Sequence, residues 1–166
     1  FSDFECPFCR AAFPIIRGIV AAYGDRGVRY VYRDFPVDDL HAHARLAAEA
    51  AQCAHAQGKF WAYHDKLFQS ADTPDAPTSG DGPLGRGALT AYARAVGLDV
   101  PAFDACVDGK QFAAEVERDV AAGRALGVTG TPTWMFLPNG DPAQARLVEG
   151  VIPYDVLAKI LDRNLR

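Results

Sequence analysis

The chain has 166 residues, of which 49% are hydrophobic and 23% charged, and its formal net charge is −4. That length suits a single domain that buries roughly two-thirds of its unfolded surface, and the composition excludes disordered, fibrous and disulfide-dense proteins. The acidic excess argues against nucleic acid or an anionic membrane as a partner, because both need clustered Lys and Arg. No apolar run reaches the roughly 18–20 residues that span a bilayer, so we expect a soluble domain with a sizeable core.

The first residues are typical of the end of a strand, and helical spacing follows from Pro7 to about Tyr23. Apolar residues recur there at intervals of three and four, so one stripe of the helix faces a core. Pro7 suits the first helical turn, where its missing N–H is no loss, whereas Pro14 predicts a bend. Because only the last residues of the strand are present, we expect a preceding segment to complete the sheet and to carry any targeting signal or tether.

A second strand is expected over residues 28–33, which alternate with period two and are rich in β-branched and aromatic types. From residue 40 to residue 127 the spacing is helical, and a loop rich in Pro, Gly, Ser and Asp interrupts it between about residues 72 and 87. This stretch predicts a helical insert whose apolar faces need something to pack on.

Two short strands are expected near the end of the chain, over residues 133–137 and 146–149, with turn-forming residues between them. Pro153 then opens a last helix. The order of elements predicts an α/β domain whose strands lie at both ends of the sequence and whose helices are inserted between them.

A pair of cysteines, Cys6 and Cys9, stands at the junction between the first expected strand and the helix. A sulfur at a helix N-terminus meets unpaired N–H groups and the positive end of the helix dipole, and both favour thiolate over thiol. Cys9 lies one turn further on, on the inward stripe, where it can close a small disulfide with Cys6 and stay shielded. We expect Cys6 to form a mixed disulfide with a partner's sulfur and Cys9 to resolve it.

Two other interpretations of this pair remain, a permanent disulfide and one half of a zinc site. A zinc site needs a second ligand pair, and the other candidates include no second C-x-x-C and no paired Cys/His knuckle. The redox interpretation is therefore favoured over both. The candidates considered as zinc ligands are Cys53, His55, Cys106, His41 and His43.

A second motif, Gly130-Thr131-Pro132-Thr133, stands just before the third expected strand. Proline lacks a donor for a β-ladder and is confined to an edge or to the start of a strand, and this tight turn is compatible with a cis bond. Only about 5–6% of X–Pro bonds are cis, so Pro132 taken alone predicts a trans bond.

Three segments together resemble the DsbA-like branch of the thioredoxin superfamily. They are FSDFECPFC at residues 1–9, QGKFW and HDKLF within residues 57–68, and GVTGTPT at residues 127–133. The resemblance runs essentially from end to end, and the combination is far more specific than a lone C-x-x-C.

The resemblance implies a thioredoxin-like α/β fold with a helical domain inserted between a β-α-β half and a β-β-α half. We expect a single DsbA-like domain over residues 1–166. Its thioredoxin-like part comprises residues 1–39 and 127–166, and its helical insert comprises residues 40–126.

The resemblance also implies thiol–disulfide exchange on protein substrates. Pro132 is then cis and faces the Cys6 sulfur, and the Thr131 backbone pairs with an extended substrate segment. Pro7 and Phe8, between the cysteines, support the site. The strongest oxidants of the family carry Pro-His there, and the His ring stabilises the thiolate. Since Phe8 cannot do this, we expect a milder oxidant.

These observations predict an extracytoplasmic bacterial thiol–disulfide oxidoreductase, in the periplasm or cell envelope, that donates the Cys6–Cys9 disulfide to folding proteins. It needs no metal or organic cofactor, because the electrons reside on sulfur. Its partners are thiol proteins and a membrane reoxidase. A disulfide reductase or isomerase is an alternative, and so is a non-catalytic thioredoxin-fold module fused to a membrane transporter.

The remaining cysteines and charges have simpler interpretations. Cys53 and Cys106 either form a second disulfide, as in some relatives, or Cys53 is a buried free thiol. We expect His41 and His43 to be solvated or to cap a helix start. The acids Asp3 and Glu5 flank the motif, and as exposed charges they should affect Cys6 little.

Overall fold

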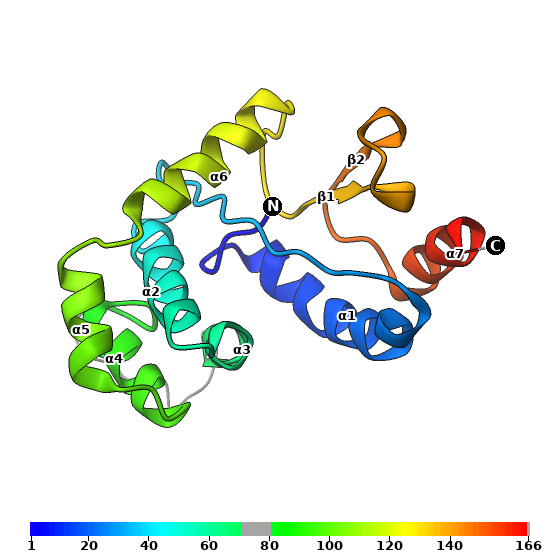
Figure 1. Ribbon diagram of the computed structural model, residues 1–166. Coiled ribbons are helices and arrows are strands. Elements are labelled where there is room, and N and C mark those ends of the chain that lie inside the picture. Colours follow the sequence, from blue (N-terminus) through cyan, green and yellow to red (C-terminus); the bar gives the residue numbers. More distant parts are fainter. Residues whose placement is uncertain (71–80, 166) are drawn as a thin grey trace.

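The computed structural model describes residues 1–70 and 81–165, in which one antiparallel hairpin accompanies seven α-helices. Figure 1 shows α2 to α5 gathered at one side, with α1, the hairpin and α7 at the other and α6 leading from the first group toward β1. The bounds are α1 Pro7–Tyr23, α2 Ala44–Ala56, α3 Phe60–Ser70, α4 Arg86–Ala95, α5 Val100–Asp108, α6 Ala113–Ala125, β1 Thr133–Phe136, β2 Arg146–Glu149 and α7 Tyr154–Asn164.

The second expected strand is wrong as a regular element, since residues 28–33 carry no β-ladder. A single parallel bridge, Ser2 with Asp34, lies just beyond them. On the side of β1, the backbone nitrogen of Phe1 donates to the Thr133 carbonyl at 2.7 Å, and the Thr133 N–H donates to the Phe1 carbonyl at 3.0 Å. A strand needs a hydrogen-bonded neighbour along its length, and residues 28–33 form no ladder with any of the described residues.

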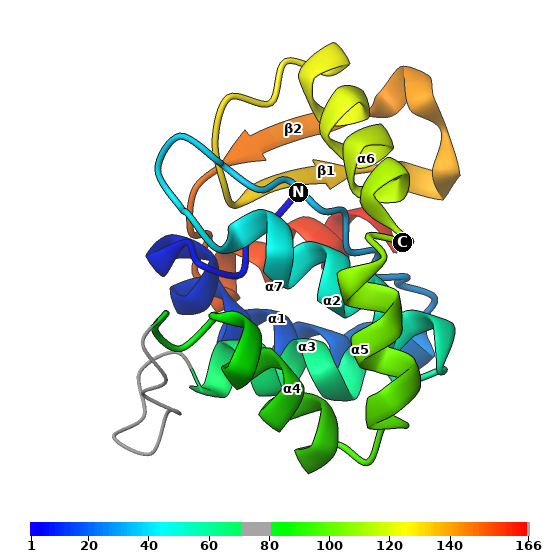
Figure 2. The ribbon, with the colours of Figure 1, turned by 90° about the vertical axis from the view of Figure 1, so that its left-hand side faces the viewer.

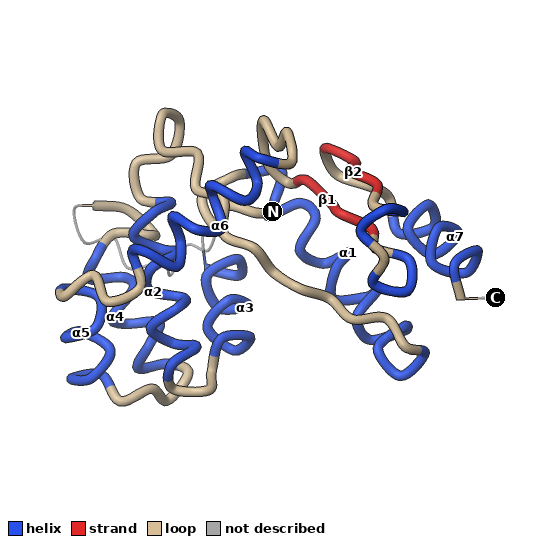
Figure 3. Tube along the Cα trace, turned by 45° about the horizontal axis from the view of Figure 1, so that its top comes forward, coloured by secondary structure: helices blue, strands red, loops and turns tan. Residues whose placement is uncertain are grey.

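The predicted hairpin is present, with Thr133 opposite Glu149 and Phe136 opposite Arg146. Apolar side chains of the hairpin pack toward α1 and α7, and α7 lies against α1 (Figure 3). The Trp134 indole N–H donates to the Gly150 carbonyl at 2.8 Å and ties β1 to the chain after β2. The end of the hairpin nearest Thr133 therefore has a fixed position beside the first residues of the chain.

Helices α2 to α5 pack side by side around a buried core of alanines and larger apolar residues (Figure 2). The small side chains of α2, from Ala47 to Ala54, allow the neighbouring helices to approach closely. A disulfide between Cys53 and Cys106 joins α2 to α5 within this core. Of the loop expected between about residues 72 and 87, residues 72–80 lie outside the described residues, and α4 begins at Arg86.

Replacing both Cys53 and Cys106 by Ala should lower the free energy of unfolding by about 2–4 kcal/mol, because the bond closes a long loop in the unfolded chain. Urea unfolding of the wild type and the double variant, followed by circular dichroism, measures the change. Alanine avoids placing an unpaired hydroxyl in the core. An unchanged unfolding midpoint would show that the bond adds nothing to stability.

Candidate active site

Cys6 stands at the N-cap of α1, directly before Pro7 at the first helical position. Its sulfur therefore lies at the end of the helix where backbone N–H groups lack intrahelical partners. Cys9 lies one turn along, on the buried side of the helix. Both residues are thiols, with exposed fractions of 4% and 1%.

The Thr131–Pro132 peptide bond is cis and lies against the cysteine pair. The Cys6 thiol donates a hydrogen bond to the Thr131 carbonyl oxygen at 3.4 Å, across 125 residues of sequence. The Pro132 carbonyl already accepts the Gly150 N–H at 2.8 Å, which fixes the loop to the end of the hairpin. The fold thus brings the two sequence motifs into one site.

The two sulfurs have opposite acidities. The hydrogen bond with the Cys9 side chain is the largest cause of a Cys6 pKa of about 5, against the opposing effect of burial. The Thr131 side chain and the backbone at Phe8 and Cys9 lower the pKa of Cys6 further. Burial raises the pKa of Cys9 above that of a free thiol, and Cys6 adds to the rise. At neutral pH Cys6 is therefore a thiolate while Cys9 keeps its proton.

Asp3 is not an exposed charge, as the sequence suggested, because its side chain is fully buried. Its carboxylate accepts the N–H groups of Glu5, Cys6 and Val37, at 2.7, 3.2 and 2.9 Å. The hydrogen bond from the Glu5 N–H to the Asp3 side chain forms an Asx turn, and the sequence Asp-Phe-Glu is compatible with such a turn. The partner at residue 37 is non-local, and no local pattern predicts it.

The expectation that His41 and His43 are solvated or cap a helix start is wrong for His41 and only partly confirmed for His43, which is the N-cap residue of α2. The Nδ1 atom of His41 lies 2.8 Å from the Asp3 carboxylate. His43 directly precedes α2, yet its side chain makes no capping bond. Instead its backbone N–H donates to Glu5 at 2.7 Å, and its Nδ1 lies 3.4 Å from the same carboxylate. Two acid–histidine pairs therefore flank the cysteine motif.

Phe8 points outward between the two cysteines, and 63% of its surface is exposed. Pro7 beside it is exposed too. A phenyl ring has no polar hydrogen to donate to the Cys6 sulfur. The largest contributions to the stability of the Cys6 thiolate therefore come from Cys9, Thr131 and the backbone, and not from Phe8.

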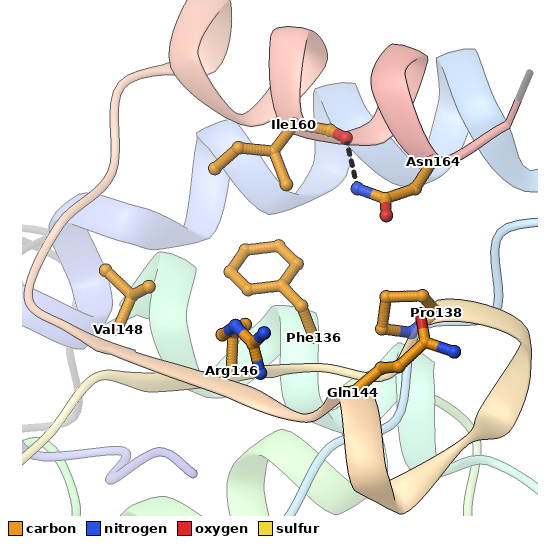
Figure 4. A pocket seen from close by; sticks show the side chains of 7 residues that line it. All are labelled: Phe136, Pro138, Gln144, Arg146, Val148, Ile160 and Asn164. Carbon is orange, nitrogen blue, oxygen red and sulfur yellow. Dashed lines mark hydrogen bonds between the residues drawn. The ribbon is translucent and has the colours of Figure 1, made fainter.

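The zinc interpretation gains no support, because residues 1–70 and 81–165 contain no group of three His, Cys, Asp or Glu side chains that could hold a metal ion. A pocket of about 320 Å³ lies elsewhere, between the hairpin and α7 (Figure 4). Its wall includes neither cysteine and no residue of the cis-proline loop. The residues that line it are Phe136, Pro138, Gln144, Arg146, Val148, Ile160 and Asn164.

The chain matches a known protein family over most of its length. A family model described as thioredoxin matches residues 1–148, so the chain belongs to this family. Solved structures similar to this one include DsbA proteins, in agreement with the resemblance found in the sequence.

Several solved structures share the fold. A thioredoxin-like oxidoreductase from Silicibacter pomeroyi DSS-3 is 29% identical, with a TM-score of 0.73 over 97% of this chain and 81% of that one. The alpha-DsbA1 protein of Wolbachia pipientis has a TM-score of 0.81 over 99% of this chain and 82% of that one, at 20% identity. At that identity the second likeness speaks for the fold alone. The thioredoxin-like fold is therefore confirmed.

Curated relatives are membrane transporters by name. The Na(+)/H(+) antiporter NhaA 3 of Salinispora tropica is 37% identical over 140 residues, which are 84% of this chain and 19% of the antiporter. The NhaA antiporter of Herminiimonas arsenicoxydans is 36% identical over 134 residues, again 19% of its length. The chain thus spans about a fifth of these relatives. None of its own helices within the described ranges is long and apolar enough to cross a membrane.

Titration of the reduced protein should give a thiolate absorbance at 240 nm with a midpoint near pH 5, assigned to Cys6. Because the Cys6 pKa is lowered, the alkylation rate should rise with pH through that midpoint and level off above it. The variant Cys6→Ser should lose the transition, whereas Cys9→Ala should keep one at higher pH, since alanine has no donor to replace the Cys9 hydrogen bond. A wild-type midpoint near pH 8.5, the value of an ordinary thiol, would contradict this assignment.

Proposed function

We propose that this chain is a thiol–disulfide oxidoreductase domain that exchanges a Cys6–Cys9 disulfide with protein thiols. The contrast between the two sulfurs carries the proposal. Cys6 lies at a helix N-terminus with a pKa of about 5, and Cys9 is buried behind it with a raised pKa. A thiol of low pKa is a good leaving group, so the bond between a partner's sulfur and Cys6 breaks readily.

The exchange proceeds in two displacements. A substrate thiolate attacks the Cys6 sulfur, the Cys6–Cys9 bond breaks, and Cys9 leaves and takes up a proton. A second substrate thiolate then attacks the substrate sulfur of the mixed disulfide, and Cys6 leaves as a thiolate. The substrate loses two electrons and gains a disulfide, while the domain ends with one thiolate and one thiol. During the first displacement, Thr131 would hold the substrate backbone.

The low pKa of Cys6 favours the reduced state of the pair, because ionisation stabilises it, and so favours donation of the disulfide. We therefore propose that the domain oxidises the thiols of folding proteins. The exposed Phe8 ring adds no stabilisation, which supports a milder oxidant than a Pro-His member. A reductase or an isomerase would use the same displacements at a lower potential.

The antiporter relatives support a setting at a membrane. We assign the domain an extracytoplasmic place, in the bacterial periplasm or cell envelope, with protein thiols as substrates and a membrane redox partner that reoxidises it. The same relatives favour a second candidate, a non-catalytic thioredoxin-fold module joined to a membrane transporter. The two candidates differ in whether Cys6 exchanges.

A trapping experiment separates the two candidates. The reduced variant Cys9→Ala, mixed with oxidised glutathione, should accumulate a mixed disulfide at Cys6, because no second thiol is present to resolve it. Mass spectrometry after acid quenching reads the adduct. The control Cys6→Ala should stay unmodified, since burial raises the pKa of its remaining thiol, Cys9, and keeps that thiol protonated. If neither variant forms an adduct, the catalytic candidate fails and the non-catalytic module takes its place.

Equilibration of the intact wild-type protein with glutathione buffers then shows whether the domain oxidises or reduces its substrates. A potential between about −120 and −180 mV places the domain with disulfide donors and isomerases, and one near about −270 mV makes it a reductant.

The variant Phe8→His should be a stronger oxidant than the wild type. A His ring between the cysteines can donate a hydrogen bond to the Cys6 thiolate, which Phe8 cannot. At a pH between the two cysteine pKa values, each unit by which the pKa of Cys6 falls stabilises the reduced pair by up to about 1.4 kcal/mol. For this two-electron couple that raises the potential by up to about 30 mV. Thiolate absorbance and glutathione equilibria measure both, with Phe8→Leu as the apolar control. Equal potentials for the His and Leu variants would refute the explanation.

A further inference from the structure

The Asp3 carboxylate holds the turn that leads into α1, although it does not take part in the sulfur exchange itself. Its Oδ1 accepts the N–H groups of Glu5 and Cys6, and its Oδ2 accepts that of Val37. The backbone N–H of Asp3 also donates to the Cys9 sulfur at 3.4 Å. One residue thus fixes the backbone at the first cysteine and contacts the sulfur of the second.

His41 is the counter-ion of this buried carboxylate. Its Nδ1 lies 2.8 Å from Asp3 Oδ2, and its side chain is 17% exposed while that of Asp3 is fully buried. A buried carboxylate is costly unless hydrogen bonds and an opposite charge compensate it. The ionisable groups that face the imidazole are the carboxylates of Asp3 and Glu5 and the sulfur of Cys6.

Resting on the function proposed above, we propose that Asp3 and His41 form a charged couple that positions the active-site turn and directs a positive charge toward the Cys6 thiolate. Both are positioning residues, because they act on the reacting sulfur through the turn and through the field of the imidazolium. The couple joins the cysteine loop to residues 37–41, the segment that leads toward α2.

The acidity of His41 supports the coupling. Partial burial opposes its charge, but the hydrogen bond with Asp3 and the charges of Asp3, Cys6 and Glu5 raise its pKa above the usual value. The interaction of two ionised groups is mutual, so a thiolate that favours the imidazolium is itself favoured by it. In the disulfide state Cys6 carries no charge, and the pKa of His41 should then be lower than in the reduced state.

The chain offers a matched control in His43. It belongs to the same segment and also pairs with an acid of the cysteine motif, but at 3.4 Å, with 33% of its side chain exposed. Its bond runs to Glu5 rather than to the buried Asp3. Replacing His43 therefore removes a histidine from the same segment without touching the Asp3–His41 pair.

The test uses the intact protein and the variants His41→Asn and His43→Asn. Asparagine places an N–H donor near the position of Nδ1 without a titrating charge, so the hydrogen bond to Asp3 can be kept. His41→Asn should raise the midpoint of the Cys6 thiolate absorbance, so that alkylation below that midpoint slows about 3- to 10-fold, whereas His43→Asn should leave it unchanged. NMR titration of the wild type should give a higher His41 midpoint in the reduced than in the oxidised protein.

The proposal is overturned if the His41 midpoint is the same in both redox states, or if both variants shift the Cys6 midpoint equally. Should His41→Asn fail to fold, the wild-type NMR titration decides alone, because it needs no variant. Failure of the proposed function would appear differently, as a Cys9→Ala protein that forms no adduct with glutathione. The His41 titration can be read whether or not the domain exchanges disulfides with other proteins.

Discussion

The active site depends on the backbone hydrogen bonds of the first two residues. Phe1 and Thr133 exchange two backbone hydrogen bonds. Ser2 forms a parallel bridge with Asp34 through two more, to the backbone of Arg33 and Phe35. Each such bond contributes about 1 kcal/mol net, and the Phe1 ring adds an edge contact to Phe35. Because Thr133 lies two residues from Thr131, this pairing brings the cis-proline loop to the cysteines. Without it, the two motifs would belong to separate parts of the chain.

The segment before α1 alternates between two environments. The ring of Phe4 stacks on Tyr32 at 5.2 Å and meets Phe68 at 5.1 Å, which anchors the segment to the helical part. Its neighbour Asp3 turns to the polar network instead. Apolar packing on one side and hydrogen bonds on the other therefore fix the same turn, and Cys6 follows it directly. A reacting sulfur needs this rigidity, since its acidity depends on contacts of a few ångströms.

Local patterns predicted the elements that depend on local interactions. The first helix, the hairpin and the last helix follow from spacing, proline positions and turn residues, and all three are present. The strand over residues 28–33 failed because a strand exists only with a paired neighbour, which a sequence pattern cannot supply. The Asp3–His41 pair was missed for a similar reason, since its members are 38 residues apart. The cysteine pair and Thr131 could each be predicted from a local sequence motif. That the two motifs meet in one site follows only from the fold.

In the proposed exchange, the Thr131 carbonyl would link the protonation of Cys6 to the binding of a substrate backbone. In the dithiol state this oxygen accepts the Cys6 S–H, at 3.4 Å. A thiolate has no proton to donate, so ionisation removes that bond and leaves the carbonyl next to a negative charge. The Thr131 hydroxyl, which has no hydrogen-bond partner among the described residues, lowers the pKa of Cys6 and is the donor that the thiolate can use. Cys6 has no S–H to donate in the disulfide either, so this backbone acceptor is released there too, and in the proposed exchange it would pair with the substrate strand.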